Sequence, residues 1–457
     1  MGRSVMVRPA APPAVKFYHR LSNRHYQVQD GRMRRHQVGS GREVNVFEKS
    51  IDIAIGSGNH AITYLTKTPQ GRLLELPLSW YAQENSWAMS PGYDRADHED
   101  FRREISDSCL FCHSGTADPS PIGCERCHGS TARHLQSPSA GTILNPARLP
   151  AERQLEVCLQ CHLQTTSSGI QDSVRRPGRS AWSFQPGEAL ADYKMLFDRT
   201  DSHDRLEINH AGYRLLQSEC FRRSSGKLQC TTCHDPHTAK LRPNLCGSCH
   251  AGAHRNDSSV AGRSCESCHM SKRVPEDAVH TRITDHKISR QPTITDAVAE
   301  NHKPYAGKVV PFYITPDPLT LAAVNRSEDL SIYRKMVERD PSNVHLLLML
   351  GKMLLRSRDT GQAVQVLEQA SALDPKCTDC VAHLAVAKAL TGDMRHALAI
   401  LQGAVAGNPD HVLAWINLGI AYEAAGNPAE ARKAYLEAIR LQPDSLEAKQ
   451  RLSRLPK

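Results

Sequence analysis

Aromatic residues are scarce in this chain, since Phe, Tyr and Trp together make up only 5% of its 457 residues. Aromatic side chains bury large apolar areas, so a hydrophobic core built from this sequence alone is lean for its length. The chain is nevertheless long enough for about two to four domains. Part of the apolar surface that these domains need is therefore expected to come from a source other than side chains.

Further absences narrow the class of protein. No stretch of about 18 apolar residues occurs, so no transmembrane segment is expected. The net charge is +9, but the sequence contains no helix-turn-helix or zinc-finger pattern, and we expect no nucleic-acid partner. The N-terminal residues MGRSVMVRPAAPPAVKF lack the apolar segment of a secretory signal peptide.

The chain does contain six copies of the pentapeptide Cys-x-x-Cys-His. In this spacing two thiols add to the vinyl groups of one haem, and the adjoining histidine reaches the iron from one face. A chain with this Cys and His content would contain about 0.025 copies by chance. A zinc site needs four ligands, and neither zinc nor a disulfide framework needs a histidine directly after the second cysteine, so the pattern favours haem over both.

The motifs predict six covalently bound haem c groups, each with an iron atom. The thioether-forming cysteines would be Cys109, Cys112, Cys124, Cys127, Cys158, Cys161, Cys230, Cys233, Cys246, Cys249, Cys265 and Cys268. The proximal iron ligands would be His113, His128, His162, His234, His250 and His269. Six haems would supply the missing apolar surface, and we expect this domain not to fold without them.

Two more expectations follow from the haems. Their propionates would offset the positive charge of the chain, which removes the main argument for an acidic nucleic-acid partner. Haem is attached to such motifs outside the cytoplasmic membrane, so we expect a periplasmic or otherwise extracytoplasmic protein, although no signal peptide is recognisable at the recorded N-terminus.

The ligand on the second face of each iron determines the chemistry, because a second histidine favours electron transfer whereas an open position permits catalysis. His237 follows the motif histidine His234 by three residues, so it lies on the proximal side and is expected to reach a neighbouring haem. His134 follows His128 by six residues, and the same argument applies. The other candidate distal ligands are His60 beside glycines, His280 and His286 after the last motif, and His254, His98, His210 and His203 for the remaining site.

The chain divides into four segments, which predict a multidomain fold. Residues 1–105 contain no cysteine, and turns at Asp30-Gly31 and Pro69–Gly71 predict a small, mainly β part that contributes a distal haem ligand. Residues 106–310 hold all six motifs and predict an irregular, mainly α multihaem domain with short helices. Residues 311–340 predict a linker followed by a helix.

Residues 341–457 predict an all-α solenoid. Asp-Pro, Asn-Pro or Gln-Pro pairs recur at intervals of 34 residues, at 340, 374, 408 and 442, which is the period of tetratricopeptide repeats. We expect three repeats and a capping helix from Ser445 to Leu455, with Lys388 as a departure in the second repeat. Helix stacking alone explains the apolar positions, and such arrays offer a concave surface to a partner.

Three cysteines lie outside the haem motifs. Cys377 and Cys380 lack a following histidine and predict a local disulfide, with a redox or metal role as the alternatives. Cys220 is expected to be a buried free thiol.

The runs IGSGNHAITYL, CHGSTARH, CHDPH, CHMSKR and VHTRITDH together resemble bacterial multihaem cytochromes c that end in tetratricopeptide repeats. Over about residues 16–305 the chain is similar to tetrahaem cytochromes of ammonia oxidisers, and more distantly to multihaem nitrite reductases and hydroxylamine oxidoreductases. The resemblance implies stacked haem pairs and mostly bis-histidine ligation, with His60, His134, His237, His280 and His286 as distal ligands. The chain departs from the reductases because no lysine replaces a motif histidine.

The expected function is electron transfer through six haems, with the repeats docking a redox partner protein and without enzymatic activity. The alternative is an oxidoreductase that acts on a small nitrogen or sulfur oxyanion at one five-coordinate haem. The two differ in whether every iron is low-spin or one is open to ligands.

Overall fold

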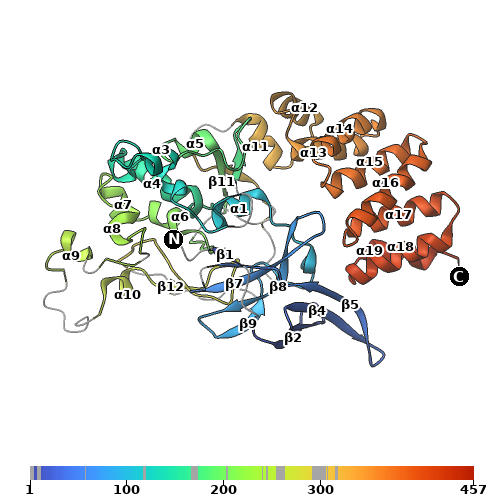
Figure 1. The fold of residues 1–457 in the computed structure, drawn as a ribbon, viewed down its shortest axis with the longest axis horizontal. Helices are drawn as coiled ribbons and strands as arrows, with labels where there is room; N and C mark the ends of the chain where they lie inside the picture. Colours follow the sequence, from blue (N-terminus) through green and yellow to red (C-terminus); the bar gives the residue numbers. More distant parts are fainter. Residues whose placement is uncertain are drawn as a thin grey trace.

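The computed structural model describes residues 5–7, 12–56, 58–116, 120–165, 173–201, 204–238, 240–242, 245–253, 263–290, 305, 307–313 and 317–456. Figure 1 shows three regions along the long axis of the molecule. The short helices that carry the Cys-x-x-Cys-His motifs lie at one end, the helical repeats lie at the other, and the strands of the N-terminal part lie between them.

The N-terminal part contains two antiparallel sheets. One has the order β1 (Val5–Val7), β6 (Ile53–Gly56), β7 (Ala61–Lys67), β8 (Leu73–Tyr81) and β9 (Ser86–Met89). The other has the order β2 (Val15–His19), β3 (Arg24–Gln29), β4 (Arg32–Gly39) and β5 (Arg42–Ser50). The predicted turn at Asp30-Gly31 is confirmed, and both residues have the positive φ of a tight hairpin, 50° and 70°.

The motif region is irregular, as expected. Its helices are α1 (Asp107–His113), α2 (Glu125–His128), α3 (Ala132–Gln136), α4 (Ala151–His162), α5 (Leu190–Tyr193), α6 (Ala211–Leu216), α7 (Glu219–Arg223), α8 (Cys230–Cys233), α9 (Leu245–Cys249) and α10 (Cys265–His269), with the 3-10 turn η2 (Pro146–Arg148). The 3-10 turn η1 (Asp100–Arg102) precedes this region. Its strands are β10 (Ser173–Arg175), β11 (Lys194–Arg199) and β14 (Val309–Pro311) in one sheet, and β12 (Lys272–Arg273) with β13 (Ile283–Thr284) in another.

The C-terminal part is a stack of paired helices. They are α12 (Leu330–Arg339), then α13 (Val344–Arg356) with α14 (Thr360–Leu373), α15 (Thr378–Leu390) with α16 (Met394–Gly407), α17 (Val412–Ala424) with α18 (Pro428–Leu441), and the cap α19 (Leu446–Arg454). The first helix of each pair and the cap α19 each begin directly after an N-cap residue; these are Asn343, Cys377, His411 and Ser445, which recur every 34 residues. The side chain of each accepts a hydrogen bond from the backbone N–H three residues further along the chain.

The predicted linker contains more structure than expected. Helix α11 (Pro318–Val324) forms inside it, because Asp317 accepts the N–H of Thr320 and Pro318 occupies the first helical turn. These signals are present in the sequence, and the expectation of a plain linker there is corrected.

The repeats pack against the N-terminal sheets through an apolar cluster. Tyr26 and Phe47 of the sheets share this cluster with Val412, Ile416 and Leu441 of the repeats. Ion pairs surround it: Arg24 binds Asp444 at 3.0 Å, Arg72 binds Asp374 at 3.1 Å, and Lys49 binds Asp410. The two ends of the chain therefore form one packed unit.

Arg35 lies at the centre of this contact and is completely buried. Its Nε donates to the carboxylate of Asp100 at 2.8 Å, and its Nη2 donates to the carbonyl of Leu441 at 3.0 Å. The carbonyl of Leu441 belongs to the last turn of α18, where a cation is favoured by the helix dipole.

We expect Arg35→Ala to lower the free energy of unfolding by about 3 kcal/mol, because it leaves the buried Asp100 with a weaker set of partners and the α18 carbonyls without a donor. Urea unfolding of the full-length protein, followed by circular dichroism, measures the change. The control is Arg32→Ala on the same strand, whose half-exposed ion pair with Glu48 contributes less than about 1 kcal/mol. Equal losses in the two variants would contradict the role of Arg35.

Candidate functional site

The six motifs lie on helices, as the sequence predicts. Five of these helices are only four to seven residues long, and α4, with twelve residues, carries the third motif in its last turns. A helical turn brings the first and second cysteine of a motif to one face, since they are three residues apart. None of the twelve motif thiols forms a disulfide.

Thiols of different motifs lie close together. Cys158 and Cys230 hydrogen-bond each other, which together with burial raises the pKa of the Cys158 thiol. Cys112 and Cys161 form a second such contact, which with burial raises the pKa of Cys161 well above its usual value. Motifs one, three and four therefore converge, and Cys112, Cys161 and Cys230 pack against the same apolar cluster.

Several motif histidines of this region lie near one another. The side chains of His113 and His162 are exposed to solvent, although the protein around them lowers the pKa of both. The nearby His286, His234 and His113 lower the pKa of His162 further, so four histidines gather in this region.

Two of the candidate distal ligands lie opposite motif histidines. The ring centres of His128 and His237 are 6.1 Å apart, and the ring planes differ by 15°. The ring centres of His234 and His286 are 6.2 Å apart, and their planes differ by 27°. The structure thus places His237 beside the histidine of the second motif rather than that of its own.

Backbone carbonyls orient several of these rings. The Nδ1 of His128 lies 2.8 Å from the carbonyl of Leu144, and that of His286 lies 3.0 Å from the carbonyl of Thr284. In the sixth motif the Nδ1 of His269 lies 2.8 Å from the carbonyl of Ser289. A carbonyl only accepts, so each Nδ1 carries the proton and Nε2 presents its lone pair, as in metal-binding histidines.

The other distal candidates have polar partners. His60 accepts a hydrogen bond at Nδ1 from Gln83 at 2.9 Å. His134 contacts the hydroxyl of Thr142 through Nδ1 at 3.0 Å. His280 lies 2.7 Å from the carboxylate of Asp94, and although burial lowers its pKa, the hydrogen bond and charge of Asp94 raise it overall. These contacts do not test whether the three histidines bind iron, so their ligand roles stay predictions.

His98 lies in a buried polar cluster of the N-terminal part. Its Nδ1 accepts the N–H of Asp100 at 3.1 Å, and Arg24 approaches its Nε2 at 3.2 Å. Burial lowers the pKa of His98 to about 3. His210 is fully buried and lies 3.5 Å from the carboxylate of Glu207, whereas His203 and His254 fall outside the described residues.

The remaining cysteines match their predicted bonding states. Cys377 and Cys380 form a disulfide at the start of α15, which confirms the local pairing. Cys220 is a free thiol, as expected, but it is half-buried rather than buried; its partial burial raises the pKa of the thiol.

The described part of the chain contains no cluster of three or more His, Cys, Asp or Glu side chains arranged to hold a metal ion. A haem iron, by contrast, takes at most two protein ligands. None of the helices that the structure describes has both the length and the apolarity to cross a bilayer.

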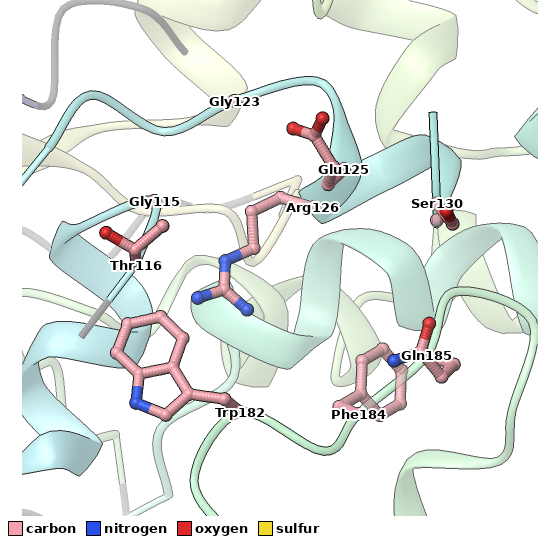
Figure 2. A pocket seen from close by; sticks show the side chains of 10 residues that line it. Gly115, Thr116, Gly123, Glu125, Arg126, Ser130, Trp182, Phe184 and Gln185 are labelled. Carbon is pink, nitrogen blue, oxygen red and sulfur yellow. The ribbon is translucent and has the colours of Figure 1, made fainter. Parts of the chain in front are cut away.

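A cavity beside the second motif has no counterpart in the sequence argument. It has a volume of ≈ 450 Å³ and is lined by residues that include Arg126, Glu125, Thr116, Trp182, Phe184 and Gln185. Figure 2 shows Arg126 reaching from α2 over the ring of Trp182. The sequence gives no signal for this cavity, because Arg126 and its aromatic neighbours lie far apart in the chain.

Two family models of the tetratricopeptide repeat match the chain, one over residues 346–381 and the other over residues 384–445. The C-terminal part therefore consists of tetratricopeptide repeats, as the 34-residue period predicts, and this class of repeat offers surfaces for protein binding. The comparison with curated proteins finds no match.

Solved structures of tetratricopeptide-repeat proteins are similar to parts of the chain. The crystal structure of MamA shares 27% identity over 30% of this chain and 82% of that one, with a TM-score of 0.27. The crystal structure of YrrB, a repeat protein with an unusual peptide-binding site, shares 23% identity over 29% of this chain and 69% of that one, with a TM-score of 0.27.

We expect the protein to lose about 2 kcal/mol of unfolding free energy between pH 7 and pH 5 through His98. Its folded pKa of about 3 lies below the value of 6.5 for an exposed histidine, so this stability is complete above pH 6.5 and is lost as the pH falls toward 3. Urea titrations at the two pH values, compared between the wild type and His98→Gln, isolate this contribution. A pH dependence that is the same in both proteins would contradict it.

Proposed function

We propose that the chain is an extracytoplasmic multihaem c-type cytochrome that carries electrons through six covalently bound haems, with repeats that dock a redox partner protein. The six Cys-x-x-Cys-His motifs supply the attachment chemistry. The disulfide between Cys377 and Cys380 supports an oxidising compartment, since such bonds persist outside the cytoplasm.

The spacing of the histidine pairs is the observation that carries this proposal. A metal held between two imidazole nitrogens at about 2 Å each separates the two ring centres by about 6 Å. The pairs His128–His237 and His234–His286 have separations of 6.1 and 6.2 Å. These separations of the ring centres support bis-histidine haem iron in both places, with one ligand from a motif and one from another segment.

The protein residues around these pairs have definable tasks. Leu144 and Thr284 hold His128 and His286 through their carbonyls and keep Nε2 available for an iron. The rings of His113 and His162 are exposed, so they stay accessible to a ligand. Haem iron between two histidines supplies reversible one-electron transfer. Closed coordination at these sites would favour the electron-transfer function over the oxyanion oxidoreductase.

Spectroscopy of the exported, haem-loaded protein tests the proposal. We expect six haems per chain by the pyridine haemochrome assay, low-spin signals in electron paramagnetic resonance, and no spectral change with carbon monoxide. A chain that matures in the same host without covalent haem would overturn the proposal. Six haems with one high-spin iron that binds carbon monoxide would instead support the oxidoreductase.

The variant His237→Ala tests the pairing with His128. We expect one of the six irons to become high-spin and to bind carbon monoxide, because its second axial ligand is removed. The matched control is His396→Ala, since His396 is exposed on the repeats and pairs with Asp393. If His237→Ala gives the same spectra as the control, His237 is not an iron ligand.

A further inference from the structure

Arg126, between the two cysteines of the second motif, carries a charge that its surroundings do not neutralise. Its Nε is buried and has no hydrogen-bond partner among the described residues. Among the described residues, its Nη2 donates to the carbonyl of Ser114 at the long distance of 3.5 Å.

Two aromatic rings hold the guanidinium in place. Its Cζ lies 4.3 Å from the ring centre of Phe111 and 4.5 Å from that of Trp182. Cation–π contacts at these distances stabilise a cation and fix its plane, but they do not satisfy its N–H donors. The guanidinium is therefore positioned with donor capacity left over.

This guanidinium borders the cavity of ≈ 450 Å³. The cavity also presents the amide of Gln185 and the hydroxyl of Ser130, which can donate hydrogen bonds. Among the described lining residues Glu125 is the one carboxylate; it accepts a hydrogen bond from Thr131, and Figure 2 shows it pointing away from Arg126. The cavity is large enough for a group of several atoms.

We propose that this cavity binds a carboxylate or a small oxyanion, with Arg126 as the principal donor. A planar guanidinium matches such groups with two parallel hydrogen bonds. The proposal rests on the proposed function in one respect, because the same chemistry has two sources: a propionate of a bound haem, or a free anion from solution.

Full-length, haem-loaded protein distinguishes the two sources. Isothermal titration calorimetry with inorganic phosphate and with acetate at low salt measures free-anion binding. Potentiometric titration of the haems between pH 5 and pH 8 reports a propionate, because a propionate held by Arg126 stays ionised over this range, whereas one released from it takes up a proton. The variants are Arg126→Gln, Arg126→Lys and the control Arg148→Gln, which removes an equal charge at an exposed position.

For a free anion, we expect the wild type to bind phosphate or acetate and Arg126→Gln to bind it at least about tenfold more weakly. For a propionate, we expect no added anion to bind, and one haem potential of Arg126→Gln to become pH-dependent. Arg126→Lys keeps the charge and should keep that potential independent of pH, as should Arg148→Gln.

If Arg126→Gln binds six haems but shows neither effect, the anion site is overturned and the proposed function stays intact. A chain that carries no haem would overturn the proposed function, and the pyridine haemochrome assay on each variant separates the two failures. Arg126→Lys preserves the cation–π contacts in part, so it keeps the test informative if Arg126→Gln does not fold.

Discussion

The buried guanidinium of Arg35 joins the N-terminal sheets to the repeats. It extends from strand β4, binds Asp100 just before the motif region, and donates to the last carbonyls of α18 in the repeats. A buried cation must find acceptors on every side, and here the acceptors come from both regions. The arrangement of sheets and repeats around Arg35 is thus fixed by directional bonds as well as by apolar contact.

This arrangement changes the expected use of the repeats. Such arrays bind partners on the concave surface formed by their first helices, yet Val412 and Ile416 of α17 pack in the cluster shared with the sheets. Asp379 of α15, which is also a first helix, pairs with His411 at 3.1 Å, so its carboxylate is engaged within the chain. Part of the surface that repeats offer to other proteins is therefore engaged within this chain, and a partner would meet the remaining surface together with the region beside it.

The sequence predicted the features that depend on local spacing. The 34-residue period located the repeats, the Asp30-Gly31 turn located a hairpin, and the pentapeptides located the motif helices. It could not pair His128 with His237, or His234 with His286, because these pairings depend on how separate loops pack. The same reason hid the cavity at Arg126, whose aromatic partners come from α1 and from a loop, and the carbonyl of Leu144, which has no side-chain signal.

Six helices of the motif region lack the usual means of holding short helices in place. Helices α2, α3, α7, α8, α9 and α10 contain no buried residue, so apolar packing of side chains does little to fix them. Under the proposed function, each haem would be bonded to its motif through two thioethers and an iron ligand, and the second histidine would tie that motif to another segment. His237 would join α2 to the loop after α8, and His286 would join α8 to the segment after β13. Since those links would replace the apolar packing that these helices lack, the histidine pairs would help to determine the fold of this region as well as its redox chemistry.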